Sequence, residues 1–235
     1  DSSTAATTFT VTITDVDEFD ISSLSDSDDT ENTISEGISN SATIGLTASA
    51  SDSDATTNGI TYEITGQSCS GAFTIGESSG IVTVANTGAL DYESATSCTL
   101  TVLATSADQS TSTTTFTITI TDANDNTPTY STNKGTQTIP EFDEGDAQTV
   151  DTVSITDLDL DATNNNVCTL GGNDQGDFTC TVSDSEYSLT FTNSPDYENP
   201  VDSDEDNVYT VTVTINDGTN TVSYTHLRAH ETSGY

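Results

Sequence analysis

The chain has 235 residues, of which 39 are Asp or Glu and only two are Lys or Arg, so its formal net charge is −37. This charge excludes nucleic acid and anionic membrane surfaces as expected partners, because both bind basic faces. Apolar residues make up only 31% of the chain, but they alternate regularly, which argues against the disorder that low hydrophobicity and high charge usually indicate.

Alternation of apolar residues with Thr or other polar residues recurs along the chain. A period of two is typical of half-buried strands, and the abundant Thr suits the outward face. Several short strands in each hundred or so residues, separated by Asp, Asn and Gly turns, predict antiparallel β-sandwiches. The alternating sets are Phe9/Val11/Ile13, Ile60/Tyr62/Ile64, Leu100/Val102/Ala104, Phe116/Ile118/Ile120, Tyr187/Leu189/Phe191 and Tyr209/Val211/Val213/Ile215.

A long internal repeat sets the domain organisation. The segment T-T-F-T-V-T-I-T-D-V-D-E starts at Thr7, and T-T-F-T-I-T-I-T-D-A-N-D starts at Thr114. A period of this length indicates an array of domains. We therefore expect the last strand and linker of a preceding repeat at 1–16, a repeat at 17–122, a linker at 123–126 and a truncated repeat at 127–221.

The segment D-A-N-D-N, residues 122–126, follows an alternating strand and precedes Thr127-Pro128. Ca²⁺ is bound by about six to eight oxygens from carboxylates, amides and backbone carbonyls. A short oxygen-rich segment between two β-rich blocks can supply part of such a shell.

The same segment resembles the linker between repeats of the cadherin family, and other elements of that family follow in order. L-D-Y-E-S at 90–94 is similar to the family's L-D-R-E, and I-N-D-G at 215–218 to its A-x-D-x-G. The resemblance implies an all-β fold of tandem Greek-key sandwiches with seven strands each. It also implies a Ca²⁺ site at this middle junction, with the ligands Glu36, Asp91, Glu93, Asp122, Asn124, Asp125, Asn126, Asp157, Asp159, Asn165 and Asp217.

Two further junctions match the family less completely. Upstream, the resemblance implies Asp15, Asp17, Asp52 and Asp54 as ligands, but Phe19 stands in the linker. The position that corresponds to Asp217 is occupied by Ser106, unless Asp108 takes that place. Downstream, it implies Glu144, Asp196 and Glu198, without a linker after them. We expect weaker or fewer ions at the upstream junction and an incomplete set of ligands at the downstream one.

The four cysteines fall two in each repeat: Cys69 with Cys98, and Cys168 with Cys180. An even split in sparse cores favours disulfides within each repeat, formed in an oxidising compartment. The alternative is buried free thiols. A zinc site is not expected, because no C-x-x-C motif occurs.

Residues 222–232 contain both histidines and the only Arg. His226 and His230 with Glu231 could form a metal site, but the string V-S-Y-T-H-L-R-A-H-E-T resembles a translated sequencing adapter. We therefore expect the native chain to end near Thr221 and residues 222–235 to be a non-native tail.

The resemblance implies an extracellular adhesion or structural module in which Ca²⁺ stiffens the junctions. Its partners would be other cadherin-like repeats, or ligands of the cell surface or matrix, and its parent protein would be secreted or membrane-anchored outside this fragment. The alternative is an accessory β-sandwich of a secreted polysaccharide-acting protein. An enzyme is not expected, because the carboxylates are ordered as metal ligands and no nucleophile motif occurs.

Overall fold

The computed structural model describes residues 1–54, 56–130, 137–139, 149–159, 166–183 and 185–228. It divides into two compact units, Asp1–Thr121 and Asp122–Tyr235. The division falls at the start of the D-A-N-D-N segment, where the repeat pattern of the sequence also changes.

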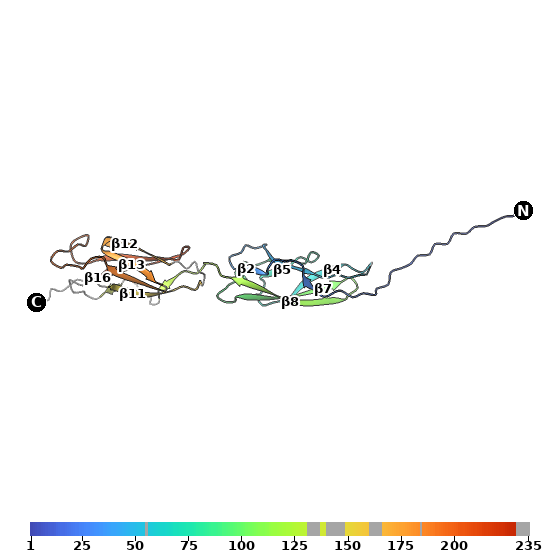
Figure 1. Ribbon diagram of the computed structural model, residues 1–235, viewed down its shortest axis with the longest axis horizontal. Helices are drawn as coiled ribbons and strands as arrows, with labels where there is room; N and C mark the ends of the chain where they lie inside the picture. Colours follow the sequence, from blue (N-terminus) through green and yellow to red (C-terminus); the bar gives the residue numbers. More distant parts are fainter. Residues whose placement is uncertain (55, 131–136, 140–148, 160–165, 184, 229–235) are drawn as a thin grey trace. The chain divides into compact units, whose positions relative to one another are not determined.

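The first unit is a sandwich of two four-stranded sheets (Figure 1). One sheet has the order β1-β3-β6-β5 and the other β2-β8-β7-β4. All neighbouring strands are antiparallel except β2 and β8, which are parallel. The strands are β1 (Ser25–Asp26), β2 (Thr33–Ser35), β3 (Thr43–Ser49), β4 (Ile60–Gln67), β5 (Phe73–Ile75), β6 (Ile81–Val84), β7 (Ser97–Ser106) and β8 (Thr111–Thr121), with a 3-10 turn η1 (Thr87–Ala89) before β7.

The second unit repeats this topology, with sheets β13-β14-β11-β9 and β10-β16-β15-β12. Again one pair is parallel, β10 with β16. The elements are β9 (Thr129–Tyr130), β10 (Gln137–Ile139), β11 (Thr149–Thr156), β12 (Val167–Gly171), η2 (Gln175–Asp177), β13 (Phe178–Ser183), β14 (Glu186–Phe191), β15 (Thr210–Asn216) and β16 (Thr221–Arg228). The predicted all-β fold of tandem sandwiches is confirmed.

Each unit has eight strands among its described residues, where seven were expected. The difference lies at the start of each unit, where one expected strand is divided into two short ones. In the first unit β1 pairs with β3 of one sheet, whereas β2 pairs with β8 of the other. A strand that changes sheets must break its ladder between them, which explains the count.

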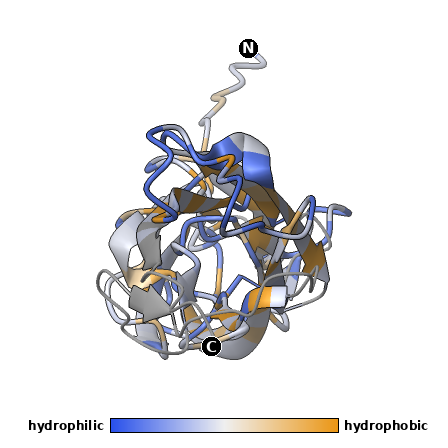
Figure 2. Ribbon diagram, turned by 90° about the vertical axis from the view of Figure 1, so that its left-hand side faces the viewer, coloured by the Kyte–Doolittle hydropathy of each residue, from blue (hydrophilic) through white to orange (hydrophobic). Residues whose placement is uncertain are grey.

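The cores are formed by the alternating residues that the sequence indicated. Along β7, Cys98, Leu100, Val102 and Ala104 are fully buried while the residues between them are not. Figure 2 shows hydrophobic and hydrophilic positions following one another along several of the strands. The core of the second unit includes Phe178, Phe191 and Tyr209, whose rings pack at centroid distances of 4.6 to 5.8 Å. Such ring pairs stabilise the core beyond the contribution of buried apolar area.

Both predicted disulfides are present. Cys69 is bonded to Cys98 with the Cα atoms 5.6 Å apart, and Cys168 is bonded to Cys180 with the Cα atoms 6.0 Å apart. The second bond joins β12 to β13, which are edge strands of different sheets. Each disulfide therefore links segments within one unit, as the distribution of cysteines predicted.

The segments near the two ends differ from the pattern of the interior strands. Residues 1–24 contain no strand, and Phe9, Val11 and Ile13 are 84%, 83% and 92% exposed. A lone strand needs a neighbouring ladder to form, so its assignment to a preceding repeat stays a prediction. Near the other end, residues 221–228 form β16, paired with β15. The described residues include no helix long and apolar enough to cross a membrane.

Candidate metal centre

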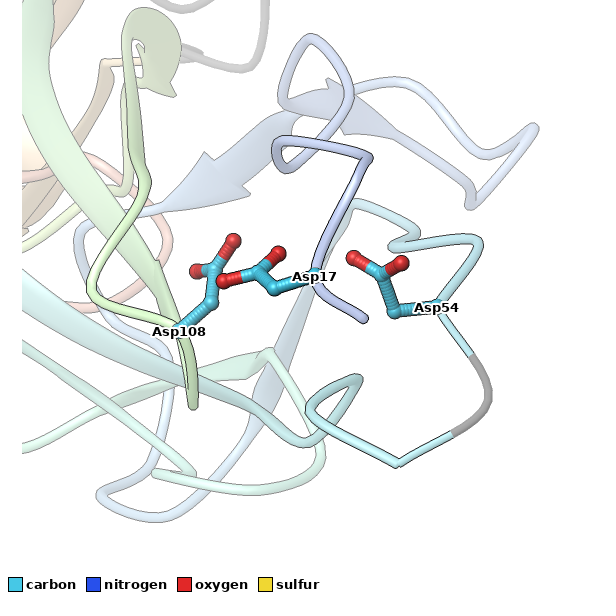
Figure 3. A group of neighbouring side chains, drawn as sticks. All are labelled: Asp17, Asp54 and Asp108. Atoms are coloured by element: carbon cyan, nitrogen blue, oxygen red, sulfur yellow. The ribbon is translucent and has the colours of Figure 1, made fainter. Parts of the chain in front are cut away.

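Three carboxylates of the first unit converge where the chain enters its sandwich (Figure 3). Asp17 lies in the segment before β1, Asp54 in the loop after β3, and Asp108 in the turn between β7 and β8. Each of these residues contributes one carboxylate oxygen to the group, and the three oxygens lie within 4.8 Å of one another. The group thus combines residues from three separate segments and contains only negative charge.

Asp54 holds the linker segment against this group. Its side chain is 3% exposed, and its two carboxylate oxygens accept hydrogen bonds from the backbone N–H groups of Glu18 and Phe19, each at 3.2 Å. Asp15 is not a member of the group, and its Oδ2 accepts a hydrogen bond from the Thr56 hydroxyl at 2.9 Å. Of the four predicted upstream ligands, the structure therefore brings Asp17 and Asp54 into the group.

Asp108 occupies the group in place of Asp52. The hydroxyl of Ser106, a residue that is 2% exposed, donates to Asp52 Oδ2, and this hydrogen bond is the main cause that lowers the pKa of Asp52. Ser110 donates its backbone N–H and its hydroxyl to Asp108 Oδ1, both at 2.7 Å. The turn thereby presents Asp108, the alternative that the sequence left open, and Ser106 orients Asp52.

The charges within this group act on Asp17. Loss of solvation raises the pKa of Asp17 above its ordinary value, and so do the hydrogen bond it shares with Asp54 and the negative charges of Asp108, Asp54 and Asp52. Like charges at short range disfavour the ionised form. The ionised group consequently favours the binding of a cation.

A corresponding group in the second unit is more deeply buried. Asp157, Asp159 and Asp217 direct carboxylate oxygens to within 4.8 Å of one another, and Asp159 and Asp217 are only 3% and 1% exposed. The backbone N–H of Asn126 donates to both oxygens of Asp159 at 3.2 Å, and its side-chain amide donates to Oδ1 at 2.9 Å. Asn126 thus contacts Asp159 as Phe19 contacts Asp54.

Asp217 has one satisfied and one unsatisfied oxygen. Its Oδ1 accepts from the backbone N–H groups of Thr219 and Asn220, at 2.7 and 2.6 Å. Its Oδ2 is buried and has no hydrogen-bond partner among the described residues. Leaving a buried charged acceptor unpaired is unfavourable by several kcal/mol, so this oxygen is suited to a ligand that carries positive charge.

Asn220, which the sequence reading did not single out, connects the linker to the same turn. Its side-chain amide donates to the carbonyl of Asn126 at 2.9 Å and to Oδ1 of Asn124 at 3.3 Å, while Asn124 donates to the carbonyl of Asp217 at 3.2 Å. The run N-D-G-T-N at 216–220 is rich in turn-forming residues, and only its turn character could have indicated this contact.

Glu36 and Glu93 form an acidic pair at another edge of the first unit. Their carboxylate oxygens lie within 4.8 Å of each other. Glu36 is 5% exposed and its Oε2 accepts from the backbone N–H of Tyr92 at 2.5 Å. Asp91 is exposed, and its two oxygens accept from the backbone N–H and the hydroxyl of Ser94, both at 2.9 Å.

The remaining predicted ligands divide into three cases. Asp122, which directly follows β8, is half-buried, and Asp125 is exposed. Asp196 and Glu198 are exposed in the segment after β14, where Asp196 accepts from the backbone N–H of Asn199 at 3.1 Å. Glu144 and Asn165 lie outside the described residues, so their roles stay predictions.

One acidic group was not predicted. Asp202, Asp204 and Asp206, in the loop before β15, also lie with carboxylate oxygens within 4.8 Å of one another. Loss of solvation and the charge of Asp206 raise the pKa of Asp204. The alternation D-S-D-E-D at 202–206 could have indicated this group, although it lies outside the junction motifs of the family.

Comparison with known proteins identifies the domain type. Residues 30–121 match the family model described as the cadherin domain. No curated protein sequence matches the chain.

Solved structures share the fold over nearly the whole chain. They include mouse cadherin-23 EC22-24 (21% identity, TM-score 0.67, 92% of this chain and 65% of that one) and the human desmocollin-1 ectodomain (20%, 0.69, 88% and 41%). A third is protocadherin gamma B2 extracellular cadherin domains 1-5 (20%, 0.64, 92% and 40%). This chain therefore spans between about two fifths and two thirds of each of those chains.

Proposed function

Because residues 30–121 match the cadherin domain, we propose that this chain is a calcium-binding module of an extracellular adhesion protein of the cadherin type. Ca²⁺ ions bind at the acidic groups next to the linker segments and stiffen the connection between consecutive repeats. The partners are other cadherin-like repeats, of the same or of neighbouring molecules, or ligands of the cell surface or matrix.

The observation that carries this proposal is the buried carboxylate of Asp217. It is 1% exposed, its Oδ2 has no described hydrogen-bond partner, and Asp157 and Asp159 lie beside it. The whole chain offers only two basic residues, Lys134 and Arg228, against 39 acids. Two carboxylates about 4 Å apart repel by about 4 kcal/mol at an effective dielectric of about 20. A divalent cation reverses the sign of this interaction.

The donor set favours Ca²⁺ over softer or smaller cations. All the candidate ligands are carboxylate, amide or backbone carbonyl oxygens, and no His or free Cys is among them. Ca²⁺ accepts six to eight such oxygens in flexible geometry, whereas zinc sites use nitrogen and sulfur, and Mg²⁺ keeps several waters. In the first unit we propose that Asp108 joins Asp17 and Asp54 as the third carboxylate.

At the middle junction, residues that precede the linker are also proposed Ca²⁺ ligands. Glu36, Asp91 and Glu93 are spaced in the sequence as the family motif requires, and Asp122, Asn124, Asp125 and Asn126 follow β8 directly. Ca²⁺ bound by both sets would restrict the linker, since an ion shared between two units opposes their separation.

Small-angle X-ray scattering tests this stiffening. In millimolar Ca²⁺ we expect a longer maximum dimension and a narrower distance distribution than in chelator, because bound ions replace repulsion between carboxylates with attraction. Asp125→Ala, which removes an exposed linker carboxylate, is expected to lose most of this response. Glu186→Gln, an exposed substitution in β14, serves as the control and should keep it. Identical scattering with and without Ca²⁺ would rule out a calcium-stiffened linker.

A further inference from the structure

An open groove in the first unit has a closed counterpart in the second. The groove has a volume of about 610 Å³ and lies between β4 and β5, with Tyr62, Ile64 and Ile75 among its lining residues. These strands are edges of different sheets. The groove therefore follows the open side of the sandwich, where each sheet ends without a further strand.

The register of the two units locates the corresponding place in the second. Cys168 pairs with Ile215 on β15 as Tyr62 pairs with Ala104 on β7. Cys180 pairs with Leu189 on β14 as Ile75 pairs with Val82 on β6, and the preceding residues are Phe-Thr in both units. The Cys168–Cys180 disulfide thus bridges the positions that Tyr62 and Ile75 hold in the first unit. The second unit closes this edge covalently, and the first does not.

The edge of β4 presents backbone groups toward the groove. The N–H of Tyr62 donates to the carbonyl of Glu77, which follows β5, at 2.8 Å. Residues two apart in a strand turn their backbone groups the same way, so the N–H of Ile64 is directed to the same side. The Gln67 side chain makes a second link, because it accepts a hydrogen bond from the N–H of Phe73 at 3.0 Å and donates to the Phe73 carbonyl at 3.4 Å. Between these two links the groove separates the edges of β4 and β5.

The charge of the groove defines what it can bind. Glu63 and Glu77 both line it and both are exposed, and no Lys or Arg is among the lining residues. An extended segment that adds a strand to an open edge gains main-chain hydrogen bonds, and alternate side chains provide selectivity. A segment with Lys residues on one face of the added strand would satisfy the edge of β4 and neutralise the two glutamates.

We propose that this groove binds an extended, Lys-containing segment of a partner protein, which adds a strand along the outer edge of β4. This function is separate from calcium binding at the linkers. The selectivity lies in Glu63 and Glu77, and the half-buried side chains of Ile64 and Ile75 accommodate the apolar side chains between the lysines.

The test uses the whole chain in millimolar Ca²⁺ and two blocked peptides, T-V-K-V-T-V-K-T and the same peptide with Glu in place of Lys. By NMR titration we expect the Lys peptide to shift resonances of β4 and β5, and to bind at least tenfold more tightly than the Glu peptide. Glu63→Gln with Glu77→Gln should weaken binding about fivefold or more. The matched control, Glu31→Gln with Glu186→Gln, removes two exposed glutamates outside the groove and should leave binding unchanged.

A second variant copies the closure found in the second unit. Tyr62→Cys with Ile75→Cys, when oxidised, should lose binding of the Lys peptide at least tenfold, and the same variant after reduction should bind better than its oxidised form. The proposal is overturned if neither peptide binds, if both bind equally, or if binding survives in the oxidised form or is insensitive to the loss of Glu63 and Glu77.

Discussion

Addition of about 10 mM Ca²⁺ to the chelator-treated chain is expected to raise its Tm by at least about 5 °C. With a dissociation constant of about 10⁻⁴ to 10⁻³ M, as in extracellular modules, one bound ion stabilises the folded state by about 1.4–2.7 kcal/mol. For a unit of this size, each kcal/mol corresponds to about 4 °C. The physical origin is the group at Asp157, Asp159 and Asp217, where two of the three carboxylates are buried.

Differential scanning calorimetry in chelator, Ca²⁺ and Mg²⁺ makes this measurement. Mg²⁺ at the same concentration controls for general screening of the charge of −37, and is expected to produce a clearly smaller shift, because it requires near-octahedral geometry and releases its waters reluctantly. Equal shifts from both ions would indicate screening alone, and no shift from Ca²⁺ would contradict binding.

Loss of the Cys69–Cys98 disulfide is the other large effect that we expect. The bond closes a loop with a sequence separation of 29 residues, and the chain-entropy relation gives about 3–4 kcal/mol of stabilisation for such a loop. Cys98 is fully buried and Cys69 is 9% exposed, so Cys69→Ala with Cys98→Ala also removes packed sulfur atoms from the core. The free energy of unfolding of the first unit should fall by at least that amount.

Urea unfolding in Ca²⁺ measures this difference, and the second disulfide provides the comparison. Cys168→Ala with Cys180→Ala opens a bond whose sequence separation is 12, for which the same relation gives about 3 kcal/mol. We expect it to destabilise the second unit and to leave the transition of the first unaffected. A first-unit transition that does not move when Cys69 and Cys98 are replaced would contradict the assigned role of that bond.

The strands and cores could be predicted from the sequence because they depend on local alternation. Phe116, Ile118 and Ile120 alternate with Thr, and β8 forms there, with Ile118 and Ile120 buried. The cysteine pairs followed from their even distribution between the repeats. The division of the first strand could not be predicted, because the choice of sheet for β1 and β2 depends on β3 and β8, which are distant in the sequence.

The acidic groups could likewise be predicted only where they follow a sequence motif. Asp157, Asp159 and Asp217 are spaced as the motif requires, and the structure brings them together. In the first unit the sequence could offer Asp108 only as an alternative, because its place depends on the turn that Ser106 and Ser110 stabilise. The open groove beside β4 was not predictable, since it results from two sheet edges that are distant along the chain.

The most direct test of calcium binding is titration calorimetry of Asp217→Asn beside the unaltered chain. Asn preserves Oδ1 as the acceptor for Thr219 and Asn220, but it removes the buried charge of Oδ2. We expect the variant to be at least as stable as the unaltered chain in chelator, since it lacks an uncompensated buried charge. It should bind Ca²⁺ at least about tenfold more weakly at that site, because a carboxylate is lost from the shell.

Asp29→Asn, at an exposed position outside the acidic groups, makes the same chemical change and should bind Ca²⁺ as the unaltered chain does. Of the two variants, we expect only Asp217→Asn to combine undiminished stability in chelator with a loss of Ca²⁺ binding. If Asp217→Asn binds Ca²⁺ with the same heat and affinity as the unaltered chain, the buried carboxylates are not the calcium site.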